Sequence, residues 1–163
     1  MGEQSVDVVR GVYEAFGRGD LPAVLGAMAD DIEWHEAEGM PYGGVYHGGE
    51  AVAQNVFGPI TQDIPDFAVK PEEFIASGDS VAAVVRYTGT GKATGKQLNL
   101  PVVHVWDVRN DKIAQFRQFI DTAKFLEVVP AAWVVFATRR AFATRRAGHS
   151  HSRFAALAAP TPP

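Results

Sequence analysis

The sequence predicts an α+β fold, in which N-terminal helices pack on a curved, mainly antiparallel sheet. Before Pro65 the apolar residues recur at helical spacing, and after it they alternate with polar residues in four runs. Helices that precede long hairpins form segregated layers, unlike the alternating units of a parallel α/β sheet. The chain has 163 residues and is 47% apolar, enough for one domain with its own core.

Two short helices are expected first. Apolar residues at helical spacing follow Ser5, a candidate N-cap, and the pattern stops at Gly17 and Gly19. Asp20 then caps a second helix with Pro22 in its first turn. The apolar positions of the first helix are Val8, Val9, Val12, Tyr13 and Phe16.

A strand and a third helix complete the first half. Residues 32–36 alternate as a short strand, the glycine-rich stretch after it is expected to be irregular, and a helix is expected from about Glu50 to Phe57. Turn signals at Gly78-Asp79, at 91–95 and at Asn110-Asp111 separate the later runs, which therefore form an antiparallel meander. These runs are 66–77, 80–90, 97–108 and 112–120.

The strand at 97–108 is apolar on both faces, with Val102, His104 and Trp106 on one face and Val103 and Val105 on the other. Helices can cover only one side of the sheet. We therefore expect a homodimer through the outer face; cover by the C-terminal segment is the alternative.

Composition excludes several classes of protein. The chain has no cysteine, so disulfides, thiolate nucleophiles and cysteine-ligated zinc or iron–sulfur sites are excluded. The net charge of −4 includes five arginines beyond Glu127, which leaves −9 on residues 1–127 and argues against a nucleic-acid surface there. No apolar run approaches the roughly 20 residues of a membrane span, and no signal peptide is recognisable, so the expected location is the cytoplasm.

Residues 130–163 differ from the domain at 1–129. This basic extension contains Phe136-Ala-Thr-Arg-Arg-Ala, repeated from Phe142, and then a proline-rich end. We expect a helix around Trp133 that docks on the body and disorder beyond Gly148. One hypothesis is that residues 131–163 have no selected role.

Three motifs match known chemistry only in part. His35-Glu36 opens like the helical zinc motif H-E-x-x-H, but Gly39 stands where its second histidine belongs. The glycines of 89–95 have the spacing of neither phosphate-binding loop, and no serine lies in G-x-S-x-G. His149 and His151 form at most a weak metal chelate.

Polar residues within apolar strands are the candidates for catalysis, because an unpartnered polar group is costly to bury. His104 should point inward, either as a core histidine or as a donor to a substrate oxygen. Asp121 ends the last strand, either as a helix N-cap or as a buried carboxylate that moves protons. His35 and Glu36 lie on opposite faces, so only one can face the cavity, and a buried Arg86 would need a partner such as Asp121.

The expected pocket surrounds Asp121 and binds a small lipophilic molecule. Its substrate-binding candidates are Phe16, Trp34, Tyr46, Phe57, Trp106 and Phe119.

Residues 5–127 resemble the nuclear transport factor 2-like superfamily, and most closely its SnoaL-like branch. The first two helices are similar to those of ketosteroid isomerase, and the segments 34–48 and 106–122 look like SnoaL-like signatures. The resemblance implies a cone-shaped α+β barrel without a metal or organic cofactor.

The resemblance also implies roles for single residues. Glu36 falls where ketosteroid isomerase has its Asp general base, and His104 near its oxyanion-binding acid, whereas Val12 matches the oxyanion tyrosine, with Tyr13 rotated about 100° away. Limonene epoxide hydrolase is similar at Arg86 and Asp121, but its second carboxylate aligns with Thr88. The SnoaL-like cyclases use an Asp acid/base, for which Asp121 with His104 is suitable.

These observations favour a cofactor-independent general acid/base enzyme acting on a small lipophilic carbonyl or polyketide-like compound, as a cyclase or isomerase. Asp121 would move the proton and His104 would polarise or protonate the oxygen, assisted by Glu36 or His35. A non-catalytic ligand-binding or dimerisation domain and an epoxide hydrolase with an incomplete triad are the alternatives.

Overall fold

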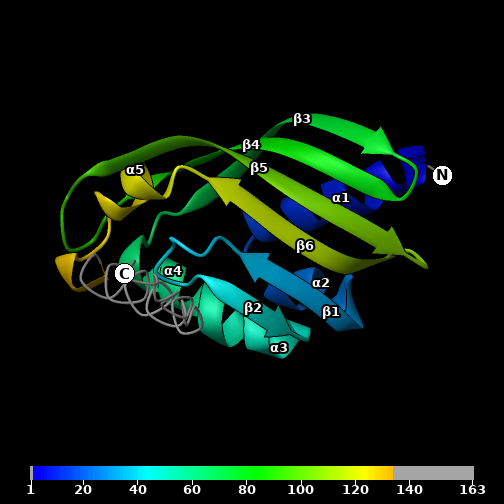
Figure 1. Ribbon diagram of the computed structural model, residues 1–163, viewed down its shortest axis with the longest axis horizontal. Coiled ribbons are helices and arrows are strands. Elements are labelled where there is room, and N and C mark those ends of the chain that lie inside the picture. Colours follow the sequence, from blue (N-terminus) through cyan, green and yellow to red (C-terminus); the bar gives the residue numbers. More distant parts are fainter. Residues whose placement is uncertain (1, 134–163) are drawn as a thin grey trace, which may run out of the picture.

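The structure, a computed structural model, describes residues 2–133; the predictions for residues from 134 onward lie outside this part of the chain. Six strands form one sheet in the order β2-β1-β6-β5-β4-β3, and the helices lie behind it in Figure 1. All neighbouring strands are antiparallel except β1 and β6, which run parallel. The predicted α+β fold with a mainly antiparallel sheet is confirmed. The strands are β1 (Met28–Glu36), β2 (Gly44–His47), β3 (Ala68–Ser77), β4 (Ser80–Thr90), β5 (Gln97–Arg109) and β6 (Lys112–Ile120).

The two N-terminal helices form as predicted, except at their start. Helix α1 (Gly2–Gly17) begins a turn earlier, so Ser5 is buried inside the helix and is not its N-cap. The additional turn is held by Gln4, whose Nε2 donates to Oδ1 of Asp111 at 2.7 Å. Asp20 caps α2 (Leu21–Gly26), because its carboxylate accepts a hydrogen bond from the Ala23 amide at 3.1 Å.

The segment between β1 and β3 is more regular than predicted. Its glycine-rich part contains β2, whose Tyr46 pairs with Trp34 of β1. The predicted third helix consists of α3 (Gly49–Val52) and a π-helical turn (Ala53–Phe57). It continues past its predicted end at Phe57 as α4 (Gly58–Asp63). Pro59 has no amide hydrogen and would clash with a carbonyl four residues earlier, which accounts for a wider turn directly before it.

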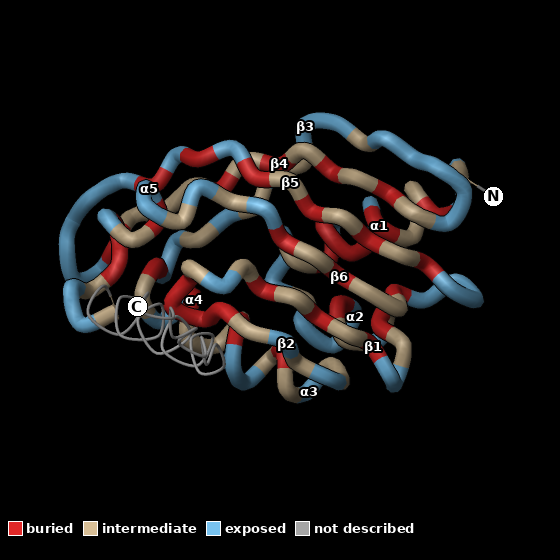
Figure 2. The backbone as a smooth tube through the Cα atoms, viewed as in Figure 1, coloured by how far each residue is buried: buried red, intermediate tan, exposed pale blue. Residues whose placement is uncertain are grey.

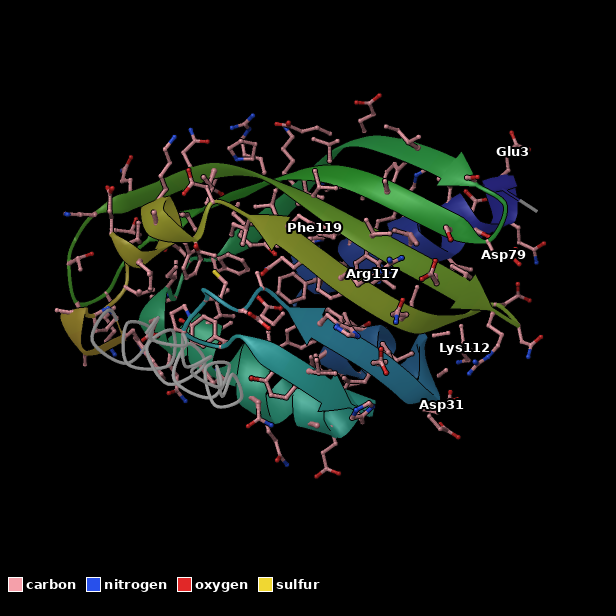
Figure 3. The ribbon with its side chains drawn as sticks, viewed as in Figure 1. Glu3, Asp31, Asp79, Lys112, Arg117 and Phe119 are labelled. Atoms are coloured by element: carbon pink, nitrogen blue, oxygen red, sulfur yellow. The ribbon has the colours of Figure 1, made fainter. Side chains whose placement is uncertain are left out.

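The meander positions the site. Buried and less buried residues alternate along β4 and β5 (Figure 2), as the period-two pattern predicts. The inner face packs against the helices, whereas Phe119 on the outer face is 57% exposed (Figure 3). Helix α5 (Thr122–Leu126) follows β6. Within residues 2–133, no helix combines the length and the apolar character needed to cross a membrane.

Beyond α5 the chain returns to the body at Trp133. Its indole Nε1 donates to Oδ2 of Asp63 at 3.0 Å, and its ring meets the edge of Tyr42, with the ring centroids 5.9 Å apart. The Tyr42 hydroxyl donates to the same carboxylate oxygen at 2.6 Å. Asp63 therefore joins Trp133 to the end of α4.

Candidate functional site

An apolar cavity lies between the inner face of the sheet and the helices α1 and α4. It contains about 480 Å³ of empty space, including its mouth. Four of the aromatic residues that we predicted to bind a substrate line it: Phe16, Trp34, Phe57 and Trp106. That they bind a substrate stays a prediction. The polar side chains on its wall are Tyr13, Glu36, Tyr87 and His104.

Among residues 2–133, Glu36 is the one carboxylate that lines the cavity. It ends β1, is 4% exposed, and accepts a hydrogen bond from the Trp34 indole at 2.9 Å. Burial raises the pKa of the Glu36 carboxyl from 4.5 to about 7, while hydrogen bonds from Trp34 and Gln118 partly oppose this change. Near neutral pH this group can both accept and return a proton.

His104 joins two tyrosines across the cavity wall. Its Nδ1 lies 2.8 Å from the Tyr13 hydroxyl oxygen, and its Nε2 lies 2.6 Å from the Tyr87 hydroxyl oxygen. The Trp106 indole donates to the oxygen of Tyr13 at 2.9 Å, and the Gln118 amide donates to that of Tyr87 at 3.0 Å. The amide orientation of Gln118 is fixed, since its Oε1 accepts the Ala37 backbone hydrogen at 3.2 Å.

One tyrosine hydroxyl proton of this network is not used in a hydrogen bond to His104. Burial lowers the pKa of His104 to about 3, so the ring is neutral near pH 7 and has one N–H. Each of the two His104 contacts needs one proton, and the ring supplies only one of them. One of Tyr13 and Tyr87 therefore donates to His104, and the hydroxyl proton of the other is available to the cavity.

Strand register brings these residues together. His104 of β5 pairs with Ala83 of β4 and with Gln118 of β6. Tyr87 lies four residues after Ala83 in β4, so both side chains point to the inner face of the sheet. The prediction that His104 points inward is confirmed, since it is 4% exposed. Tyr87 and Gln118 were not among the predicted site residues, although both keep the alternation of their buried neighbours.

Tyr13 was not among the predicted site residues, because it stands one place from Val12 and about 100° around the helix. Val12, Tyr13 and Phe16 all line the cavity. The buried stripe of α1 is wide enough for two consecutive residues, because residues 100° apart fit within the apolar stripe of an amphipathic helix. A search of the whole stripe would have found Tyr13.

The predicted placement of Asp121 in the pocket is wrong. Its side chain is exposed and caps α5, where it accepts a hydrogen bond from the Lys124 amide at 3.1 Å. Phe119 and Tyr46 are also absent from the cavity wall. Phe119 faces outward because it follows buried Gln118 in β6, and successive side chains of a strand point to opposite faces. The Tyr46 hydroxyl donates to the Tyr42 carbonyl at 2.6 Å.

Arg86 and His35 lie outside the cavity. Arg86 pairs with Glu72, with 2.7 Å between Nε and Oε1, and not with Asp121, the partner suggested for a buried Arg86. The site of an epoxide hydrolase, which Arg86 and Asp121 suggested, is therefore not assembled. His35 contacts Glu33 at 2.5 Å on the opposite face of β1 from Glu36, as alternation requires. Among residues 2–133, no group of three or more His, Asp or Glu is placed to hold a metal ion.

Comparisons with known proteins agree with this architecture. The model of the SnoaL-like domain matches residues 9–116. An NTF2-like protein of unknown function from Burkholderia pseudomallei is 34% identical, with a TM-score of 0.72, over 77% of this chain and 97% of that one. No curated protein matches the chain.

Two further structures are similar. TerC, co-crystallised with polyporic acid, is 26% identical, with a TM-score of 0.71, over 77% of this chain and 97% of its own. A protein with a ketosteroid isomerase-like fold from Catenulispora acidiphila, in complex with trimethylamine, shares the fold at 18% identity and a TM-score of 0.67, over 77% of this chain and 95% of that one. The chain belongs to the SnoaL-like family of the nuclear transport factor 2-like superfamily.

Proposed function

We propose that the protein is a cofactor-independent acid/base enzyme that forms an enolate from a small lipophilic carbonyl compound, as in an isomerisation or a cyclisation. One observation carries this proposal. Glu36 is a lone carboxylate with a pKa of about 7, buried in an apolar cavity that also contains a tyrosine hydroxyl free to donate.

Each group then has one role. Ionised Glu36 removes a proton from the carbon next to the carbonyl, and the electron pair moves onto the carbonyl oxygen. The free hydroxyl of Tyr13 or Tyr87 donates a hydrogen bond to that oxygen, which stabilises the developing charge. Protonated Glu36 returns the proton to another carbon in an isomerisation. In a cyclisation the first carbonyl re-forms as the enolate carbon attacks a second carbonyl carbon. The electron pair of that second C=O bond moves onto its oxygen, which takes the proton from Glu36.

Glu36 thus takes the proton-moving role that the sequence suggested for Asp121. His104 contacts both tyrosines and is neutral, so it positions the donor and does not protonate the oxygen. Phe16, Trp34, Phe57 and Trp106 would bind the lipophilic body of the substrate. The co-crystal of TerC with polyporic acid supports a small organic ligand for this family.

Two expectations remain predictions alongside this proposal. A homodimer through the outer face is still expected, since Val103 pairs there with exposed Phe119. Light scattering, which measures the mass in solution, tests this expectation. Location in the cytoplasm is likewise an expectation.

Hydrogen–deuterium exchange tests the chemistry without the natural substrate. Small lipophilic ketones are incubated with the protein in D₂O, and deuterium at the carbon next to the carbonyl is followed by mass spectrometry. Glu36→Gln should slow the exchange by about 10²–10⁴-fold, the usual cost of losing a general base. Asp121→Asn is the matched control, because it makes the same chemical change at an exposed cap and should leave exchange unchanged.

A non-catalytic ligand-binding domain is the second candidate, favoured by the internal hydrogen bonds that His104 makes on both ring nitrogens. In that case ketones bind in the cavity but acquire deuterium no faster than in buffer. Equal exchange by the wild type and Glu36→Gln would refute Glu36 as the base.

A further inference from the structure

A second hollow adjoins the cavity on the side of α2. This outer groove is lined by Gly17, Leu21, Val24, Ala53 and Thr61, and it contains about 890 Å³ of space open to solvent. Phe16, Phe57 and Phe67 line both the groove and the cavity. These three rings therefore form a wall that the two hollows share.

The shared phenylalanines separate the outer groove from the cavity. The ring centroid of Phe16 lies 5.5 Å from that of Phe57 and 6.4 Å from that of Phe67, both edge to face. All three rings are only half-buried. An edge-to-face pair contributes only about 0.5–1.5 kcal/mol beyond the area that it buries.

The chemistry of the outer groove suits an apolar occupant. In the part of the chain that the structure describes, no charged side chain lines it, and Leu21 is 38% exposed although it is a large apolar residue. The hydroxyl of Thr61 donates to the Phe57 and Gly58 carbonyls of its own helix at 2.9 Å. The groove therefore offers apolar surface, and its one side-chain hydroxyl is already engaged.

We propose that the outer groove binds an unbranched apolar tail of the ligand whose carbonyl end lies beside Glu36. The inference rests on the proposed function for the position of that end. The tail would pass between Phe16, Phe57 and Phe67. The protein would then select its substrate by tail length as well as by the reacting carbonyl.

The test is a series of methyl ketones with increasing unbranched alkyl chains. Their dissociation constants are measured by calorimetry and by quenching of tryptophan fluorescence, because Trp34 and Trp106 line the cavity. Each methylene that enters the groove should tighten binding about three- to fourfold. The gain per methylene is the measured quantity.

Gly17→Phe should obstruct the groove. A side chain added at Gly17 meets no atom within 4 Å, and Gly17 is the last residue of α1. Gly11→Phe is the matched control, since Gly11 is exposed on the same helix, is equally free of neighbours and does not line the groove. Leu21→Glu tests the same surface by placing a charge in it.

Gly17→Phe and Leu21→Glu should abolish the gain per methylene, while Gly11→Phe retains it. The inference is overturned if the wild type shows no gain, or if both groove variants keep the wild-type gain. Glu36→Gln separates the two proposals, because it should keep the gain even though it loses exchange. Exchange without a length dependence would refute only the groove, and a length dependence without exchange would refute only the enzyme.

Discussion

Replacing Glu36 by Gln should change how the stability of the protein depends on pH. Burial raises the pKa of Glu36 from 4.5 to about 7, so the folded protein keeps a proton that the unfolded chain releases between these values. Unfolding then releases a proton, and stability falls as the pH rises through this window. The contribution is fully present below about pH 4.5 and is lost above about pH 7.

The magnitude follows from the same two values. A tenfold change in proton affinity corresponds to about 1.4 kcal/mol, so wild-type Glu36 should lose about 3 kcal/mol of unfolding free energy across the window. The glutamine of the variant cannot ionise, although its side-chain oxygen can still accept the Trp34 hydrogen bond. The unfolding free energy of the variant minus that of the wild type should therefore be larger at about pH 8 than at about pH 4.5.

Urea unfolding at a series of pH values measures this difference. His104 acts in the opposite direction, because burial lowers its pKa from 6.5 to about 3 and its contribution grows as the pH rises between these values. Both proteins contain His104, so its effect cancels in the wild-type minus variant difference. Asp121→Asn serves as the control. Parallel stability curves for the wild type and Glu36→Gln would show that the pKa of Glu36 is not raised by burial.

Three further predictions concern the same core. His104→Leu should lower the unfolding free energy by about 2–5 kcal/mol in urea titrations, because two buried tyrosine hydroxyls each lose a partner; a neutral effect would contradict the network. Deuterium exchange into ketones should rise with pH around an apparent pKa of about 7 and then level off, as required if ionised Glu36 is the base, and a flat profile would count against it. Truncation before residue 131 should lower thermal stability more than truncation before residue 134, by about 1–2 kcal/mol, because only the former removes the Trp133 bond to Asp63. The hypothesis that residues 131–163 have no role instead requires that truncation before residue 131 leaves the melting temperature and the activity of the full chain unchanged.

Alternation along the strands was enough to predict the sheet and one side of the site. Period two placed Val102, His104 and Trp106 on one buried face, and it separated Glu36 from His35. Both results depend only on the side-chain period of a strand, which the sequence contains directly. The pairing of β1 with β6, which brings Glu36 near Gln118, joins residues about 80 positions apart and has no local signal.

The errors arise where two physical roles share one residue type. Asp121 is both a favoured N-cap and a plausible buried acid, and only its hydrogen bond to the Lys124 amide separates the two. Tyr13 was rejected on a strict residue-by-residue register, although a wide helical stripe accepts neighbouring positions. Arg86 alternates correctly onto the outer face, where Glu72 on the neighbouring strand is its partner.

The arrangement of charge explains why burying Glu36 favours the proposed reaction. The carboxylate is costly in the apolar cavity, and this cost raises its pKa. During enolate formation the negative charge leaves Glu36 and moves to the substrate oxygen, so the total charge of the cavity stays constant. That oxygen receives a hydrogen bond from the free tyrosine hydroxyl, and in a medium of low polarity such a bond is strong. A protonated His104 would add a positive charge, which its burial prevents; the neutral ring instead keeps both tyrosines in place and leaves one of them able to donate.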